Sequence, residues 1–106
     1  MNWSNSFDAT IVEVKEVFST EDLEIGQIVK SKSGRDKGRL FIIYEIVDDQ
    51  YVRLVDGDLR KLENPKLKKI KHLSKYNAVV VEIKEKLDSN IELKDSHIRK
   101  ILSNYK

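Results

Sequence analysis

The sequence predicts a small domain that is mainly β and ends in two helices. Between residues 25 and 55, short apolar segments rich in β-branched and aromatic residues alternate with turn signals, a pattern typical of strands. After residue 73, apolar residues recur every three or four positions, which is the spacing of a helix. The length of 106 residues suits one domain with a limited core. We therefore expect an N-terminal extension over residues 1–22, a β domain over 23–73 and a helical hairpin over 74–106.

Two structures are open for the N-terminal extension. Ile11, Val14 and Phe18 have the spacing of one helix face, whereas residues 12–15 alternate like a strand. The extension is also acidic. A short helix packed on the β domain and a mobile acidic tail are therefore both compatible with it.

Three strands are expected in the β domain. Residues 25–29 form a short apolar segment, residues 40–47 form a nearly continuous apolar run, and residues 51–55 alternate like a half-exposed strand. The run over 40–47 is apolar on both faces through Ile43. One of its faces should close the core, and the other should lie under the extension or the C-terminal helices. Arg53 alternates with apolar neighbours and should point outward.

Polar turns separate the expected strands. Residues 48–50 (Asp-Asp-Gln) reverse the chain, and Asp56-Gly57 is a strong signal for a tight hairpin turn because glycine accepts positive φ. Residues 59–63 are then predicted to form a further short amphipathic strand. This strand should end at Asn64-Pro65, because proline lacks a backbone N–H.

A basic loop over residues 31–38 joins the first two strands. Gly34 and Gly38 allow backbone conformations in which N–H groups turn outward as anion-binding donors. Arg35 offers a planar fork for a phosphate or a guanine edge, whereas the lysines of the loop act as point charges. We expect Asp36 to accept local N–H bonds or to orient Arg35. The alternative is an ordinary solvated hairpin loop whose lysines protect an edge from aggregation.

A second basic segment follows Pro65. In residues 66–73, Leu67, Ile70 and Leu73 recur at every third position, and we expect them to anchor the segment. The polar residues of the segment should then form a basic ridge, which comprises Lys66, Lys68, Lys69, Lys71 and His72. Each phosphate that such a ridge neutralises steepens the salt dependence of binding by close to one unit in a log-log plot.

The net charge of +2 conceals a strong segregation of charge. Residues 1–29 contain one basic and six acidic side chains, whereas residues 30–75 contain thirteen basic and seven acidic ones. Concentrated basic charge of this kind is the footprint expected of a phosphate-binding surface. Lysines that serve solubility alone would give the same composition.

The order of these features resembles the KOW motif. Gly26, the basic loop, the apolar strand after it and the Asp56-Gly57 turn follow the order of that motif, which marks small SH3-like barrels in ribosomal and transcription proteins. SKSGRDKGR (31–39) and LVDGDLRKLENPKLKKIKHL (54–73) are similar to the KOW-domain family of the archaeal and eukaryotic large-subunit ribosomal protein fourteen-e. The resemblance covers residues 24–73. It implies an SH3-like barrel that contacts ribosomal RNA.

The resemblance and the charge pattern together predict an RNA-binding, ribosome-associated protein that contacts the RNA backbone. The expected partner is ribosomal RNA of the large subunit, with ribosomal, transcription or translation proteins as further partners, and the expected state is a cytoplasmic monomer. The residues assigned to RNA contact are Lys30, Lys32, Ser33, Gly34, Arg35, Lys37, Gly38, Arg39, Arg53, Arg60, Lys61, Lys66, Lys68, Lys69, Lys71 and His72.

The sequence offers no candidate for catalysis or metal binding. Without cysteine it has no thiolate ligand, thiol nucleophile or disulfide, which suits a reducing cytoplasm. His72 and His97 have no carboxylate or cysteine at ligand spacing, and Gly34 and Gly38 lack the Lys-Ser or Lys-Thr of a nucleotide-binding loop. No apolar run has the length of a membrane span, and the first residues lack the layout of a signal peptide. We expect no enzyme activity, no cofactor and no membrane partner.

Two helices are expected in the C-terminal hairpin. The first should begin at Ser74 and the second at Asp95, each as an N-cap. Packing on the β domain is the default, and a separate partner-binding element is the alternative. In that alternative the protein is an interaction module that docks a partner through the KOW barrel or the helices. Its contact residues would include Ile98, Leu102 and Tyr105.

Overall fold

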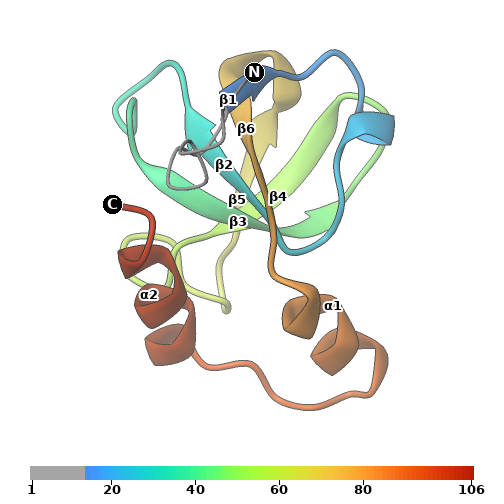
Figure 1. Ribbon diagram of the computed structural model, residues 1–106, viewed down its shortest axis with the longest axis vertical. Coiled ribbons are helices and arrows are strands. Elements are labelled where there is room, and N and C mark those ends of the chain that lie inside the picture. Colours follow the sequence, from blue (N-terminus) through green and yellow to red (C-terminus); the bar gives the residue numbers. More distant parts are fainter. Residues whose placement is uncertain (1–13) are drawn as a thin grey trace, which may run out of the picture.

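The computed structural model describes residues 14–106, and over this range the protein is mainly β with two C-terminal helices (Figure 1). Six strands of the described residues form one antiparallel sheet in the order β1-β6-β2-β3-β4-β5. The strands are β1 (Val14–Glu16), β2 (Gln27–Ser31), β3 (Leu40–Ile46), β4 (Tyr51–Val55), β5 (Lys66–Lys69) and β6 (Leu73–Val79). The helices are α1 (Val81–Asp88) and α2 (Asp95–Ser103), with short 3-10 helices η2 (Thr20–Asp22) and η3 (Ile70–His72).

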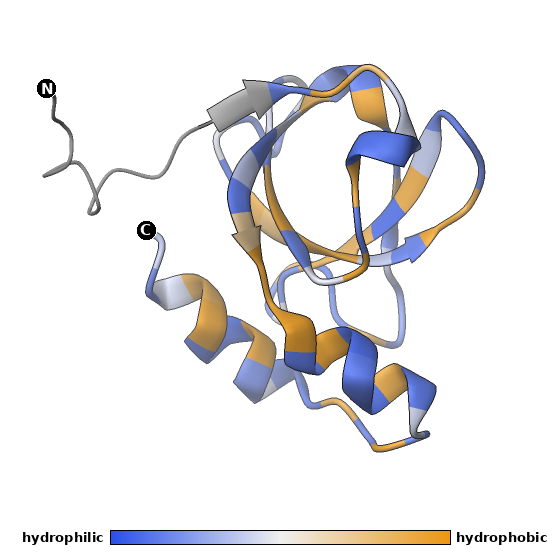
Figure 2. Cartoon of the chain, turned by 45° about the vertical axis from the view of Figure 1, so that its right-hand side comes forward, coloured by the Kyte–Doolittle hydropathy of each residue, from blue (hydrophilic) through white to orange (hydrophobic). Residues whose placement is uncertain are grey.

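The central strands bury both of their faces, so the sheet has a core on each side. Neighbouring residues alternate between the two cores: Phe41 and Ile43 belong to one core, and Ile42 between them belongs to the other. The sheet curls around the first core (Figure 2), which we call the inner core. The inner core consists of Val17, Leu23, Val29, Phe41, Ile43, Val52, Leu54, Ile70 and Leu73. The outer core consists of Ile28, Leu40, Ile42, Val55, Tyr76, Ile83, Ile98 and Leu102.

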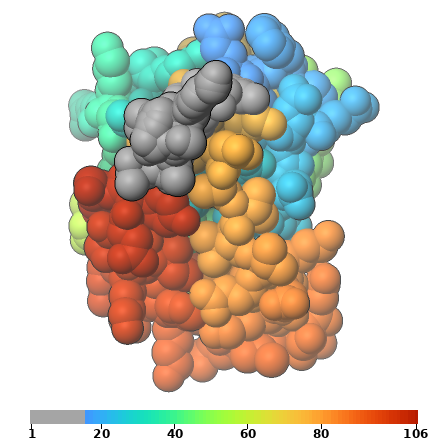
Figure 3. All heavy atoms as spheres, in the orientation of Figure 1, coloured from blue at the N-terminus to red at the C-terminus, as the bar shows by residue number. Residues whose placement is uncertain are grey.

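The two helices cover the outer core and close it from solvent. Figure 3 shows the two helical segments side by side at one end of the molecule. Ile98 and Leu102 of α2 are 0% and 1% exposed, so they are not available as the contact surface that the alternative function requires. The helical hairpin is therefore part of the packed domain.

Two glycines mark where the helices approach the sheet most closely. Gly26 has φ +92°, and a Cβ there would collide with the backbone oxygen of Val80, just before α1. Gly57 has φ +77°, and a Cβ there would collide with the backbone oxygen of Asp95 at the start of α2. Any larger residue would have to push a helix away from the sheet.

The described part of the N-terminal extension belongs to the domain. β1 pairs with β6 in the register Val14 with Tyr76, and Val17 contributes to the inner core. The expected helix or strand over residues 11–18 is thus a strand at 14–16, and the residues of that prediction before Val14 lie outside the described range.

The prediction that a helix begins at Ser74 is wrong, because residues 73–79 form β6. This strand pairs with β1 on one side and β2 on the other, so both edges of its backbone are hydrogen-bonded. The helical spacing of Tyr76, Val79 and Ile83 is therefore misleading. α1 begins only at Val81, after the Val80 N–H has bonded to the Gly26 carbonyl.

Two further local predictions are corrected by the structure. Residues 59–63 form no strand, because the Asp56 carboxylate accepts the N–H groups of Asp58 and Arg60 and holds the chain in a turn. Asp95 is not the N-cap of α2, whose cap position is Lys94. The Asp95 carboxylate instead accepts the N–H of Leu62 at 2.8 Å and thereby ties α2 to this turn.

Candidate functional site

The two basic segments, far apart in sequence, lie side by side. The Lys32 N–H donates to the carbonyl of His72 at 2.7 Å, which joins the basic loop to η3. The Lys68 ammonium donates to the carbonyl of Ser33 at 3.0 Å, which joins the same loop to β5. The basic loop and the lysine-rich segment therefore form one continuous surface.

Asp36 is the residue that holds this surface together. Its carboxylate accepts the Ser31 hydroxyl at 2.7 Å, the Lys68 ammonium at 3.0 Å and the Lys66 ammonium at 2.6 Å. Burial alone would raise the pKa of Asp36, but the hydrogen bonds from Lys66, Ser31 and Lys68 outweigh it and hold the pKa far below its usual value. The expected partners, local N–H groups or Arg35, are not the observed ones.

Leu67 of the lysine-rich segment is predicted to point into the core, but it points outward. Leu67 is 53% exposed and is not an anchor, whereas Lys68 is 9% exposed; Ile70 and Leu73 are buried as expected. Successive residues of a strand point to opposite faces, so Leu67 and Lys68 cannot both point inward. The carboxylate of Asp36 gives the buried ammonium of Lys68 a partner, so Lys68 points inward and Leu67 points outward. Two lysines of the expected basic ridge, Lys66 and Lys68, are therefore engaged in ion pairs with Asp36.

Arg39 is also engaged by carboxylates. Its Nε donates to Asp56 at 2.5 Å and its Nη2 to Asp58 at 2.9 Å. Asp56 is 4% exposed, and burial by itself would raise its pKa. The hydrogen bonds from the Arg39 side chain and from the N–H groups of Arg60 and Asp58 lower that pKa overall. Arg39 thus links the end of the basic loop to the 56–60 turn, and Arg99 of α2 donates to the Gly57 carbonyl in the same turn at 2.6 Å.

A pocket of about 270 Å³ opens between the basic loop and the 56–60 turn. We call it the basic pocket. Phe41 and Leu59 form its apolar part, and Asp36 with its ion-pair partner Lys66 forms part of one wall. Five cationic side chains line the pocket: Arg35, Lys37, Arg39, Arg60 and Lys66.

A second group of cations surrounds His72. Partial burial lowers the pKa of His72, and the charges of Lys71, Lys68, Lys69 and Lys32 lower it further. We call these five residues the His72 cluster. Lys69 also lies 5.9 Å from the centre of the Tyr51 ring. Positive charge from the loop and from β5–η3 therefore converges at this position.

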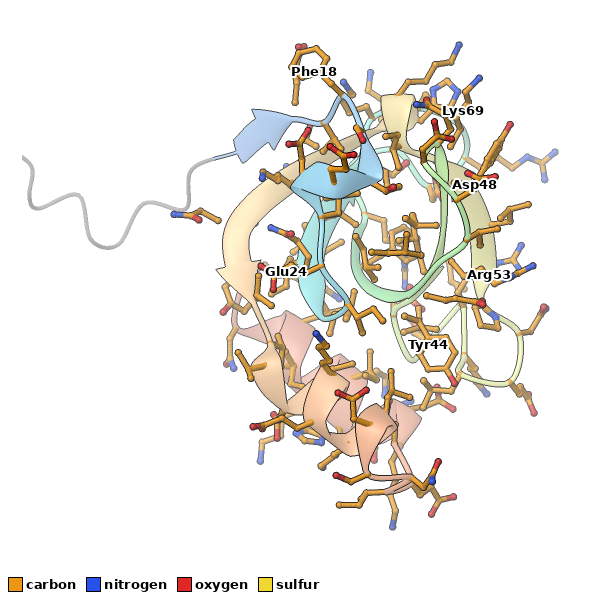
Figure 4. All side chains as sticks on the ribbon, turned by 90° about the vertical axis from the view of Figure 1, so that its right-hand side faces the viewer. Phe18, Glu24, Tyr44, Asp48, Arg53 and Lys69 are labelled. Atoms are coloured by element: carbon orange, nitrogen blue, oxygen red, sulfur yellow. The ribbon has the colours of Figure 1, made fainter. Side chains whose placement is uncertain are left out.

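The other residues assigned to RNA contact are spread more widely. Arg53 pairs with Glu45 at 2.8 Å, and Figure 4 shows it on the same side of the molecule as Asp48 and Lys69. Lys30 lies near Tyr105 and Lys106 beside a separate depression. Lys61 is exposed and does not line the basic pocket. Ser33, Gly34 and Gly38 belong to the basic loop, and both glycines have positive φ.

Sequence reasoning misses the roles of two residues. It predicts Asp56 only as a turn residue, and it places Leu59 in a strand. The spacing of Asp56 to Asp58 and Arg60 signals a turn closed by a side chain, but its pairing with Arg39 spans 17 positions and has no local signal. Leu59 is 69% exposed at the pocket, which only the three-dimensional arrangement reveals.

Comparison with known proteins does not place the chain in a family: no protein-family model matches it, and no curated protein matches it either. Within residues 14–106, no group of three or more acidic or histidine side chains could hold a metal ion. No helix in this same range is long and apolar enough to cross a membrane. The function therefore has to be inferred from the arrangement of the basic surface.

Proposed function

We propose that this protein binds RNA through its backbone phosphates and associates with the ribosome, as the resemblance to KOW-domain proteins implies. The observation that carries the proposal is the hydrogen bond from the Lys32 N–H to the His72 carbonyl, because it brings two basic segments into one surface. Separate basic segments on opposite sides would serve solubility equally well. A single concentrated surface favours binding to a polyanion.

The proposal includes an SH3-like barrel of the KOW kind. Three features support it: an antiparallel sheet that curls around an inner core, a basic loop between β2 and β3, and the short helix η3 between β5 and β6. Gly26 and Gly57, two of the glycines on which the resemblance rests, both have positive φ.

The mode of recognition that we propose is contact with phosphates and RNA shape. Lys68 of the His72 cluster is paired with Asp36, and the other lysines of the cluster act as point charges and carry little sequence information. Electrostatic contacts of this kind give affinity that falls steeply with salt. The proposed activity is binding without catalysis, by a cytoplasmic monomer whose partner is ribosomal RNA of the large subunit.

Charge reversal in the His72 cluster tests the proposal. Lys32 and Lys71 are exposed, so the double variant Lys32→Glu/Lys71→Glu should fold normally. We expect its affinity for a fluorescently labelled hairpin RNA to fall by at least about tenfold and the salt slope to become shallower. The matched control is Lys84→Glu/Lys100→Glu, which reverses two exposed lysines on α1 and α2. An equal loss of RNA affinity in both double variants would mean that the effect comes from net charge alone, and this would contradict the proposal.

A second measurement tests association with the ribosome. The tagged protein should sediment with large subunits from a lysate at low salt and return to the top of the gradient at high salt. The Lys32→Glu/Lys71→Glu variant should remain at the top in both conditions. If the wild-type protein stays at the top at every salt concentration, the ribosomal partner is wrong.

A further inference from the structure

The basic pocket combines two surfaces that a phosphate site alone does not need. One side carries cations, and the other is formed by Phe41 and Leu59. Phe41 is 1% exposed and belongs to the inner core, whereas Leu59 is 69% exposed at the pocket. A ligand that uses both sides must have an anionic part and an apolar part.

The cationic side of the pocket has unused binding capacity. Arg39 and Lys66 are paired with carboxylates, so they contribute mainly to the walls. Within the described residues, the side chains of Arg35, Lys37 and Arg60 make no hydrogen bond or ion pair of their own, and Arg35 and Lys37 are exposed. The Asp36 carboxylate has both oxygens occupied by lysines and Ser31, which offsets its repulsion of an anion.

The walls of the pocket are held in place before any ligand arrives. Asp36 fixes the basic loop to β5, and Arg39 fixes the end of the loop to the 56–60 turn. That turn is closed by Asp56 and held against α2 by Asp95 and Arg99. A preformed pocket lowers the entropy lost on binding.

We propose that the basic pocket binds a single nucleotide, with its base against Leu59 and its phosphate on Arg35, Lys37 and Arg60. The pocket volume of about 270 Å³ is slightly smaller than the roughly 300–1,000 Å³ of pockets for drug-sized ligands. A pocket of this volume suits a ligand as small as one nucleotide. Arg35 can bind the phosphate or stack its guanidinium plane on the base. The nucleotide is either an unpaired residue of a bound RNA or a free mononucleotide. The first source rests on the RNA binding proposed above.

Two exposed leucines give a matched pair of variants. Leu59 lines the pocket and Leu67 does not, yet both are large apolar residues in the same part of the chain, 69% and 53% exposed. Serine at either position should leave the fold intact, because neither side chain belongs to a core. Leu59→Ser removes the contact with the base, and Leu67→Ser controls for the loss of an exposed leucine.

The experiment compares a fully paired hairpin RNA with the same hairpin carrying one bulged nucleotide. We expect the wild-type protein to prefer the bulged RNA by about fivefold or more, Leu59→Ser to lose this preference and Leu67→Ser to keep it. In parallel, nucleoside monophosphates are titrated while the backbone amide signals of the basic loop and the 56–60 turn are followed by NMR.

The outcomes separate the two sources of the nucleotide and the two proposals. A bulge preference that depends on Leu59 supports a nucleotide of a bound RNA. Signal shifts in the pocket with a free monophosphate, lost in Leu59→Ser but without a bulge preference, support a free nucleotide. Equal binding of both hairpins, together with no shifts, overturns the nucleotide pocket. If that equal binding still depends on Lys32 and Lys71, RNA binding through the His72 cluster stands. If neither hairpin binds, RNA binding is overturned as well.

Discussion

The ammonium of Lys68 lies 3.0 Å from a carboxylate oxygen of Asp36, and both side chains are only 9% exposed. A buried ion pair is retained in a small domain only where further hydrogen bonds satisfy it, and here Ser31, Ser33 and Lys66 supply them. This network fastens the basic loop to β5. The loop that carries much of the proposed RNA-binding surface is thus shaped by a carboxylate.

The first prediction concerns the charge of Asp36. Asp36→Asn keeps the size of the side chain but leaves the Lys68 ammonium buried without a counter-charge. We expect the free energy of unfolding to fall by about 2–4 kcal/mol, measured by urea denaturation. Asp88→Asn, on an exposed position at the end of α1, should change it by less than about 0.5 kcal/mol. A similar small change in Asp36→Asn would mean that the pair contributes little.

The second prediction concerns acid. The pKa values of Asp36 and Asp56 are both lowered in the folded protein, so the folded state binds protons less readily than the unfolded state. Their contribution to stability is therefore complete above the unfolded pKa of about 3.9 and is lost as the pH falls toward the folded values. Urea midpoints should stay level near neutral pH and drop steeply below about pH 4. Asp36→Asn should show a shallower drop, and an equal drop would contradict the role given to Asp36.

The third prediction compares two glycines with nearly equal φ. Gly57 (φ +77°) faces the backbone of Asp95, whereas Gly38 (φ +88°) has open space where a Cβ would lie, with no other atom within 4 Å. Gly38→Ala should reduce the free energy of unfolding by about 1–2 kcal/mol, the cost of the left-handed backbone alone. Gly57→Ala should reduce it by at least about 2 kcal/mol more, because the 56–60 turn or α2 must move. Thermal unfolding of both variants measures the difference, and equal losses would show that α2 adapts freely.

The fourth prediction concerns His72 and rests on the proposed RNA binding. Partial burial and the surrounding lysines lower the pKa of His72, which favours its neutral form in the free protein. A bound phosphate would reverse this by favouring the charged form. RNA affinity should therefore rise as the pH falls below the ordinary histidine pKa of about 6.5, by roughly threefold or more beyond the change seen in His72→Gln. Fluorescence anisotropy with a labelled hairpin RNA measures this, and identical pH profiles would exclude a protonated His72 from the contact.

The local sequence predicts the elements whose signals lie within a few residues. β3, β4 and the turn between them follow from β-branched runs separated by Asp-Asp-Gln, and the structure places both strands within a residue of the prediction. The tight hairpin predicted at Asp56-Gly57 is wrong, because the strand that pairs with β4 after this turn begins only at Lys66. Asp48 accepts the N–H groups of Gln50 and Tyr51, which is the local bonding expected of such a turn. α2 also lies where its apolar stripe predicts it.

Elements that depend on distant partners are predicted poorly. Residues 73–79 have a spacing compatible with a helix, but the backbones of β1 and β2 offer hydrogen bonds on both sides and make them a strand. Lys68 points inward because Asp36, 32 positions earlier, neutralises it. Neither partner can be identified from the spacing of the segment itself.

The sequence by itself determined where the basic charge is concentrated, where the chain turns, and that a β domain is followed by helices. Only the tertiary structure decided which cations are available to a ligand. Arg39, Lys66 and Lys68 are paired with carboxylates, while Arg35, Lys37 and Arg60 border a pocket with an exposed leucine. The physical reason is that charge and turn propensity are properties of single residues and their neighbours, whereas ion pairing and burial depend on contacts between segments that folding brings together.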